Sequence, residues 1–191
     1  MKALEEKILR EGRILPGHIL KVGSFFNQQM DIRLLMDMGG EIARAFRDSG
    51  VTKVLTVEAS GIALAVAAAY ALGVDAVFAK KNAAANVSGE LYTAEVYSYT
   101  HKNTNVISVN REYITREDCV LVVDDFLATG NAVNGLISIV AAAGATLAGV
   151  SAGIEKGFQG GGDALRAKGI RVESLAVIDA FTEDNSIRFR P

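Results

Sequence analysis

Apolar positions in the N-terminal part of the chain recur at helical spacing. They predict a helix over residues 3–11 that stops at Gly12, and a second helix that begins after an N-cap at Asp31 and ends before Gly50. The segment 14–30 between these helices has no such period. Its aromatic side chains look exposed, which is unusual for a simple linker.

Beyond Gly50 the pattern changes to short apolar runs that alternate with helical stretches. The runs predict strands at 54–57, 74–79, 120–123, 146–154 and 170–178, and a polar hairpin with arms 91–100 and 104–110. Further helices are predicted at 62–72, 132–143 and 163–169. Strands that alternate with helices pair in parallel through right-handed crossovers. The pattern therefore predicts one α/β domain over 1–191, with a mostly parallel sheet flanked by helices.

The composition fits a buried sheet and argues against nucleic-acid binding. Hydrophobic residues make up 50% of the chain, aromatic residues 7%, and there is no Trp. This mixture is typical of helices packed on a parallel sheet whose strands are buried on both faces. The formal net charge is −2 and the Lys and Arg residues are scattered, whereas nucleic-acid binding depends on clustered cations. We expect no nucleic-acid partner.

The cysteine and histidine content excludes several kinds of site. Cys119 is the single cysteine, so an intramolecular disulfide and a metal site of several cysteines are excluded. His18 and His101 match no zinc spacing, and neither is given a catalytic role. The N-terminal residues are too charged for a signal peptide, and no apolar run reaches the roughly 20 residues of a membrane span. We expect a soluble cytoplasmic protein with no membrane partner.

The most informative segment is VLVVDDFLATGNA, residues 120–132. Its apolar strand delivers two adjacent carboxylates, Asp124 and Asp125, and a loop of small residues then leads into a helix. Ligands of open α/β sheets bind beyond the carboxyl ends of the strands, and the N–H groups at a helix start bind anions. Carboxylates accept hydrogen bonds from sugar hydroxyls, or they bind the hydroxyls through a shared metal ion. The segment therefore predicts a sugar-phosphate site.

Other interpretations of this segment are weaker. An Asp pair after an apolar strand also occurs in receiver-type domains, and a strand end can carry solvated acids without function. The coincidence of acids, Thr-Gly loop and helix start favours a ligand site. The chain has no Gly-x-x-x-x-Gly-Lys-[Ser/Thr] sequence, and the glycines at 160–162 do not follow a strand as a dinucleotide-binding turn requires. A P-loop and a dinucleotide fingerprint are therefore excluded.

Residues 120–132 resemble the signature of the type I phosphoribosyltransferases: four apolar residues, two acids, then a small-residue loop with Thr-Gly. Family members often have Thr-Gly-Gly-Thr at 129–132, where this chain has Thr-Gly-Asn-Ala, which removes one hydroxyl but leaves the backbone anion site. The resemblance covers essentially the whole chain and is most specific to members that use xanthine. The segments that carry it are LKVGSFFNQQMD (20–31), VEASGIA (57–63), VYSYT (96–100), VDDFLATGNA (123–132) and GIEKGFQ (153–159).

The resemblance implies the family's fold and reaction. A small hood, here mainly residues 1–35, would cover the base, and a flexible hairpin lid, here 80–100, would close over the site. The reaction implied is a step of purine salvage, in which the 5-phosphoribosyl group passes from phosphoribosyl pyrophosphate to a purine base. Mg²⁺ would bind with the donor, mainly through the substrate and near Asp124 and Asp125. A homodimer is also implied.

The donor-binding residues follow from the same resemblance. Asp124 and Asp125 would be the catalytic pair that holds the ribose hydroxyls. The remaining donor-binding residues would be Ala128, Thr129, Gly130, Asn131 and Ala132 at the 5′-phosphate, and Glu58, Ala59, Ser60, Gly61 and Lys81 at the pyrophosphate. Taken alone, a Ser-Gly turn is more often only a turn, and Lys80 and Lys81 would be surface lysines.

The expected base-binding residues are Leu20, Asn27, Lys156 and Phe158. By resemblance Lys156 donates to a purine oxygen and Phe158 flanks the ring, although the sequence alone would favour a solvated loop lysine. Asn27 offers both a donor and an acceptor, which suits xanthine better than guanine or hypoxanthine. The expected products are xanthosine 5′-monophosphate and pyrophosphate.

Two alternatives stay open at this stage. The base could be guanine, hypoxanthine or adenine, because specificity data alone separate the purines. A sensor of phosphoribosyl pyrophosphate on the same fold is the other alternative, since a fold does not fix a function. The sensor is disfavoured because the residues before the core are neither numerous nor basic enough for a DNA-binding extension.

Overall fold

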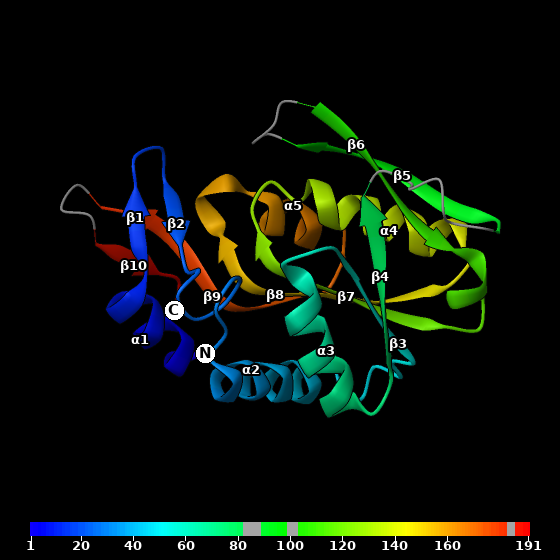
Figure 1. Ribbon diagram of the computed structural model, residues 1–191, viewed down its shortest axis with the longest axis horizontal. Helices are drawn as coiled ribbons and strands as arrows, with labels where there is room; N and C mark the ends of the chain where they lie inside the picture. The colour runs from blue at the N-terminus through cyan, green and yellow to red at the C-terminus, as the bar shows by residue number, and fades with distance from the viewer. Residues whose placement is uncertain (82–88, 99–102, 183–185) are drawn as a thin grey trace.

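The computed structural model describes residues 1–81, 89–98, 103–182 and 186–191, built around an eight-stranded sheet (Figure 1). The strand order is β10-β9-β8-β7-β3-β4-β6-β5. The strands are β3 (Lys53–Val57), β4 (Asp75–Lys81), β5 (Leu91–Ser98), β6 (Asn103–Asn110), β7 (Cys119–Leu127), β8 (Thr146–Lys156), β9 (Val172–Phe181) and β10 (Ile187–Phe189). Residues 82–88 and 99–100 of the predicted lid, and His101, lie outside the described residues.

The centre of the sheet is parallel. β4, β3, β7, β8 and β9 pair in parallel, which confirms the predicted α/β fold with a mostly parallel sheet. The outer strands β10, β6 and β5 pair antiparallel with their neighbours, β10 and β5 being the edges, and β5 and β6 are the arms of the predicted hairpin. β10 has three residues, too few for a period to be recognised in the sequence.

Helices cover both faces of the sheet (Figure 1). α2 (Ile32–Ala45) and α3 (Gly61–Leu72) pack on one face, and α4 (Asn131–Ala142) and α5 (Gly161–Ala167) on the other. The side chains of β7 alternate between the two cores, since Leu121 and Val123 belong to one and Val120 and Val122 to the other. This burial on both faces is why β7 reads as a continuous apolar run.

Some predicted element ends match the structure, and others differ by a few residues. The N-cap Asp31 accepts a hydrogen bond from the Leu34 N–H at 3.2 Å, and α3 ends at Gly73, whose φ of 72° is left-handed. β7 continues beyond the predicted end at Val123 as far as Leu127. Asp124 and Asp125 therefore lie within the last part of the strand and not in a loop.

The segment 14–30 is more ordered than predicted. After α1 (Lys2–Glu11), the strands β1 (Arg13–Leu15) and β2 (Ile19–Lys21) form a small antiparallel hairpin. The expectation that the aromatic residues are exposed was wrong, because Phe25 and Phe26 are each 2% exposed and belong to the core with α2. Adjacent aromatics outside any period carry no sequence signal for burial.

No helix in the described ranges is long and apolar enough to cross a membrane.

Candidate functional site

The carboxyl ends of β3, β7 and β8 meet at a cavity of about 880 Å³. The turn between β1 and β2 borders it on one side and the β5–β6 hairpin on the other. Small-molecule sites in proteins have volumes of roughly 300–1,000 Å³. The cavity therefore has the size and the place in the sheet that an open α/β fold gives to its ligand site.

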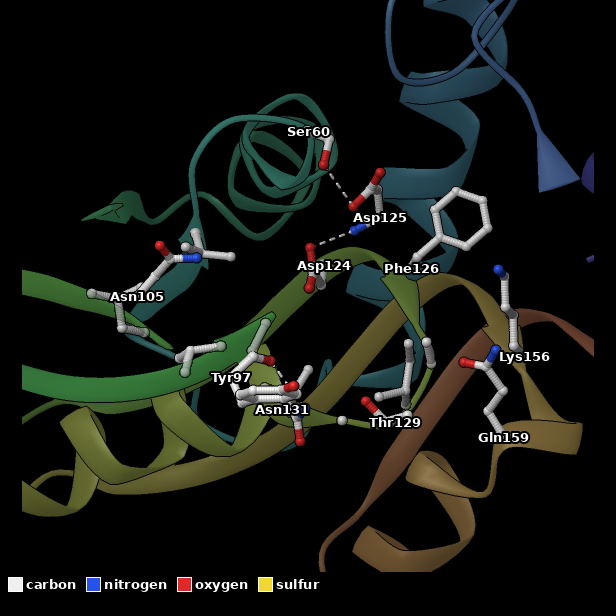
Figure 2. Close-up of a pocket in the computed structure, with 18 of the residues that line it drawn as sticks. Ser60, Tyr97, Asn105, Asp124, Asp125, Phe126, Thr129, Asn131, Lys156 and Gln159 are labelled. Atoms are coloured by element: carbon white, nitrogen blue, oxygen red, sulfur yellow. Dashed lines mark hydrogen bonds between the residues drawn. The ribbon is translucent and has the colours of Figure 1, made fainter. Parts of the chain in front are cut away.

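The two carboxylates predicted from the sequence line this cavity. Figure 2 shows Asp124 and Asp125 side by side, with the Ser60 side chain directed at Asp125. Ser60 Oγ donates to Asp125 Oδ1 at 2.9 Å, and Asn27 Nδ2 donates to Asp125 Oδ2 at 3.1 Å. The Asp125 N–H donates to Asp124 Oδ1 at 2.9 Å. Asp125 thus joins three segments that the sequence analysis had assigned to separate parts of one site.

Asp124 is buried, and its surroundings oppose its ionisation. Burial raises the pKa of the Asp124 carboxyl well above its ordinary value of 3.8, and the neighbouring charge of Asp125 raises it further. The positive charge of Lys81, which also lines the cavity, acts in the opposite direction. A cation bound next to the pair would make the ionised form of Asp124 more favourable.

The substitution Asp124→Asn is expected to stabilise the folded protein at neutral pH. The folded protein holds the Asp124 proton to a higher pH than the unfolded chain does, so the free energy of unfolding falls as the pH rises from about 3.8 through the folded pKa. Asparagine keeps the acceptor for the Asp125 N–H and carries no charge. Thermal melts at about pH 4 and about pH 8 check this linkage. The gain in Tm over wild type should be larger at the higher pH, and equal gains at both would contradict it.

The loop predicted to bind the 5′-phosphate connects β7 to α4, and all five of its residues, 128–132, line the cavity. Gly130 has a left-handed φ of 83° and caps α4, whose first N–H groups have no acceptor within the helix. Asn131, the residue at which the chain departs from the family pattern, donates from Nδ2 to the Tyr97 carbonyl at 3.1 Å. The loop is thereby linked to β5 of the hairpin (Figure 2).

The predicted pyrophosphate turn lies at the end of β3. Glu58 and Ser60 line the cavity with Lys81, whereas Ala59 and Gly61 do not. The Lys81 N–H donates to Glu58 Oε1 at 2.6 Å, which holds the Glu58 carboxylate against β4. α3 begins at Gly61, so this turn also lies at the N-terminal end of a helix.

Lys156 ends β8 and lines the opposite side of the cavity. Its Nζ lies 5.7 Å from the centre of the Phe126 ring and donates to the His18 carbonyl at 3.4 Å. Burial lowers the pKa of the Lys156 ammonium.

The other residues predicted to bind the base lie outside the lining. Asn27 reaches the site through its bond to Asp125, and Leu20 is 6% exposed within the core. Phe158 packs edge-on against Phe181, with ring centres 5.3 Å apart, and lies 5.9 Å from the His18 ring.

Several lining residues were missed by the sequence analysis. Figure 2 shows Phe126 beside Lys156, and Gln159 next to Lys156. His18, which has a left-handed φ of 59° in the β1–β2 turn, also lines the cavity. Phe126 could have been found, because it directly follows Asp125 in the signature segment. His18 offered no comparable signal, since only the hairpin places it at the cavity.

A buried carboxylate pair lies between two helix starts at the edge of a parallel sheet, an arrangement that can accept hydroxyl donors and bind anions. The family model described as "Phosphoribosyl transferase domain" matches residues 28–159, and the chain belongs to this family. The family and the fold class predicted from the sequence are therefore confirmed.

Relatives cover nearly the full chain. The xanthine phosphoribosyltransferase of Lactobacillus delbrueckii subsp. bulgaricus is 51% identical over 187 residues, which span 98% of this chain and 99% of the relative. The xanthine phosphoribosyltransferase of Oceanobacillus iheyensis is 49% identical over 190 residues, spanning 100% and 97%.

Solved structures show the same fold. The adenine phosphoribosyltransferase from Trypanosoma brucei, in complex with AMP, pyrophosphate and ribose-5-phosphate, superimposes with a TM-score of 0.77 at 19% identity and covers 95% of this chain and 83% of that one. The APRTase from Giardia lamblia complexed with 9-deazaadenine has a TM-score of 0.77 at 21% identity, with 91% and 96% covered. At these identities the likeness concerns the fold alone.

Proposed function

We propose that the protein transfers the 5-phosphoribosyl group of phosphoribosyl pyrophosphate to xanthine, giving xanthosine 5′-monophosphate and pyrophosphate in purine salvage. The observation that carries the proposal is the position of the Asp124–Asp125 pair, between the 128–132 loop, the Ser60 turn and Lys156 in one cavity. The names of relatives about half identical over the whole chain favour xanthine as the base.

The donor would lie across the two helix starts. Residues 128–132 would bind the 5′-phosphate through backbone N–H groups, and the turn 58–61 with Lys81 would bind the pyrophosphate. Each oxygen of Asp125 accepts one protein hydrogen bond, and a carboxylate oxygen has room for a second. The Asp124 and Asp125 carboxylates would thus accept the ribose hydroxyls and fix the anomeric carbon between the leaving group and the base.

The base would lie between Lys156 and Phe126. Lys156 would donate to an oxo group, and Phe126, which lines the cavity next to it, would flank the purine ring. Asn27 would be within reach of the same region because its amide is held by Asp125. Phe158 and Leu20 stay predicted base contacts. Neither lines the cavity, so residues of the hood would have to move before either side chain could contact the base.

The reaction is a displacement in which a purine nitrogen forms a bond to the anomeric carbon as the bond to the pyrophosphate oxygen breaks. The base nitrogen loses its proton to water or to the departing pyrophosphate, and the electron pair of the broken carbon–oxygen bond leaves with pyrophosphate. Positive charge develops on the ribose ring, so the adjacent carboxylates stabilise the transition state, and closure of a lid would exclude water.

The carboxylate pair also fits Mg²⁺ bound through the donor. Among the described residues no cluster of three or more His, Cys, Asp or Glu side chains could hold a metal ion. Two adjacent carboxylates suit an ion that keeps several waters and is bound mainly by substrate phosphates. When bound near Asp124 and Asp125, the ion supplies positive charge next to the leaving pyrophosphate.

Product formation from phosphoribosyl pyrophosphate and Mg²⁺, measured separately with xanthine, guanine, hypoxanthine and adenine, tests the function. Preference for xanthine is expected. Turnover of another base would keep the donor site and overturn the base assignment. Inactivity with all four would overturn the enzyme assignment.

Lys156→Met is expected to lower kcat/KM for xanthine by about 10- to 100-fold, because a charged donor to a buried oxo group is lost. The control is Lys2→Met, because the Lys2 side chain is 88% exposed on α1.

Asn27→Ala should alter the ratio of rates with xanthine and guanine, since it removes the side chain that offers both a donor and an acceptor. Steady-state kinetics with both bases measure these effects. Unchanged xanthine turnover and base preference in Asn27→Ala would contradict the base assignment.

We further propose that the hood comprises mainly residues 1–35, that the hairpin at 80–100 is a flexible lid, and that the protein is a cytoplasmic homodimer. The Asn131–Tyr97 hydrogen bond supports a lid that touches residues 128–132, the phosphate loop. The single cysteine is consistent with a reducing compartment.

The dimer proposal rests on exposed apolar side chains on the neighbouring helices α2 and α3. Ile32 and Met36 are 61% and 38% exposed, and Val66 and Tyr70 are 54% and 77% exposed, each pair one helical turn apart. Tyr70→Glu is expected to raise the dimer Kd by about 30-fold, as loss of a central aromatic contact does. Analytical ultracentrifugation measures it, and a monomeric wild type would refute the dimer.

A further inference from the structure

The phosphate loop rests directly on the first residue of α5. The buried Gly161 donates its N–H to the Ala128 carbonyl at 3.1 Å. A Cβ added to Gly161 would lie 2.3 Å from the Ala128 oxygen, 2.6 Å from the Thr129 carbonyl carbon and 2.7 Å from the Gly130 nitrogen. The backbone of three consecutive loop residues is therefore in contact with α5, with no space for even one methyl group.

An ion pair between a half-buried arginine and a buried carboxylate fixes α5 to the sheet. Arg166, in the last turn of α5, donates from Nη1 and Nη2 to the two oxygens of Glu155, each at 2.8 Å. Glu155 is 0% exposed and also accepts from Ser174 Oγ at 2.5 Å. The start of α5 packs on the same carboxylate, because a Cβ on Gly162 would lie 2.0 Å from Glu155 Oε1. A two-point Arg–carboxylate contact sets orientation as well as distance.

Glu155 also lies next to the base side of the site. It precedes Lys156 in β8, and successive strand residues point to opposite faces. Glu155 accordingly faces α5, while Lys156 lines the cavity. One buried carboxylate is thus next in the chain to the lysine proposed for the base and connected through α5 to the loop proposed for the 5′-phosphate.

Stability alone does not account for this pair. Replacing a buried ion pair by apolar residues is often neutral or stabilising, because desolvation of the charges offsets their attraction. What the Glu155–Arg166 pair provides is the orientation of α5, and this orientation determines where Gly161 lies under the loop.

We infer that Glu155 and Arg166 are positioning residues for the donor: through Gly161 they set the place of the 128–132 backbone at which the 5′-phosphate binds. The inference rests on the proposed function. Neither side chain needs to touch the substrate, and α5 itself is not a ligand site.

Two variants test the inference. Gly161→Ala should displace the loop, and Arg166→Lys should keep a positive charge near Glu155 while losing the two-point contact. Both are expected to raise the KM for phosphoribosyl pyrophosphate by about 10-fold or more, with a smaller change in the KM for the base, because a shift of about 1 Å in a binding group has effects of this size. The control is Ala164→Gly, which weakens α5 at an exposed position without touching the loop.

Calorimetric titration with ribose 5-phosphate gives a second readout that needs no turnover. Its affinity should fall in both variants and stay near the wild-type value in Ala164→Gly. Wild-type KM and affinity in Gly161→Ala and Arg166→Lys would overturn the inference. So would an equal loss in Ala164→Gly, which would mean that general weakening of α5 is enough.

The two proposals fail in distinguishable ways. A wild type that binds ribose 5-phosphate but transfers no phosphoribosyl group to any of the four bases would overturn the proposed function, while the variants would still support or refute the positioning role. A wild type that neither forms product nor binds ribose 5-phosphate would overturn both.

Discussion

Asp125→Asn is expected to lower turnover by at least about 100-fold, and the double variant with Asp124→Asn by more, while the protein stays folded. The Asp125 carboxylate accepts from Ser60 and from Asn27, one on each oxygen. An asparagine amide accepts on its oxygen only, so one of the two contacts has to reverse its direction, with Ser60 or Asn27 accepting from the new amide. The substitution also removes negative charge next to the carbon on which positive charge develops.

The matched control is Asp118→Asn, the same substitution at the residue that directly precedes the first residue of β7. Asp118 accepts hydrogen bonds from Thr52 and Thr115 and lies outside the cavity lining. Its substitution should leave kcat unchanged even where the melting temperature falls slightly. Rates measured at saturating donor and base, with circular-dichroism melts on each variant, separate loss of chemistry from loss of fold. An unaltered rate in the double variant would remove the catalytic assignment.

Gly61→Ala is the second substitution with a large expected effect, about a 100-fold loss in kcat/KM for the donor. A Cβ at Gly61 would lie 2.3 Å from Thr56 Oγ1 and 2.9 Å from Asp124 Oδ1. Both neighbours are buried, at 1% and 6% exposed, so the start of α3 has to move instead. Ser60 would move with it and lose its geometry toward Asp125.

A double variant provides the check on this mechanism. Thr56 Oγ1 is buried and has no hydrogen-bond partner among the described residues, so Thr56→Ala alone should be close to wild type. Combined with Gly61→Ala, it removes the closer of the two contacts and should restore kcat/KM by about 10-fold, as coupled neighbours do. If the effects of the two single substitutions on kcat/KM simply multiply in the double variant, the contact with Thr56 is not the cause of the loss in Gly61→Ala.

Much of the donor side could be predicted from the sequence because it is made of local signals. The Gly73 stop, the N-cap at Asp31 and the acid pair before a small-residue turn each depend on residues a few positions apart. Such short-range patterns specify strand, turn and helix, and parallel pairing then brings the strand ends together. The same reasoning places the 128–132 loop at the cavity without knowledge of any contact.

The contacts across the site could not be predicted in the same way. Ser60 and Asn27 were assigned to different substrates, and only the folded chain shows that both donate to Asp125. Phe158 follows Lys156 closely in sequence, but a 3₁₀ turn over Gly157–Gln159 directs it to His18 and Phe181. The direction of a side chain in so short a turn depends on tertiary packing that no periodicity reports.

The shared acceptor at Asp125 has a consequence for how the protein is made. Its two donors lie 65 and 98 residues earlier in the chain, and its strand β7 pairs with β3 on one side and β8 on the other. Contacts of such long sequence separation slow folding, because a long loop has to close before they form. While the ribosome has not yet released Asp125, Asn27 and Ser60 have no acceptor and the sheet has no centre. The cavity also needs Lys156 from β8, so it cannot be complete until this later strand has left the ribosome as well.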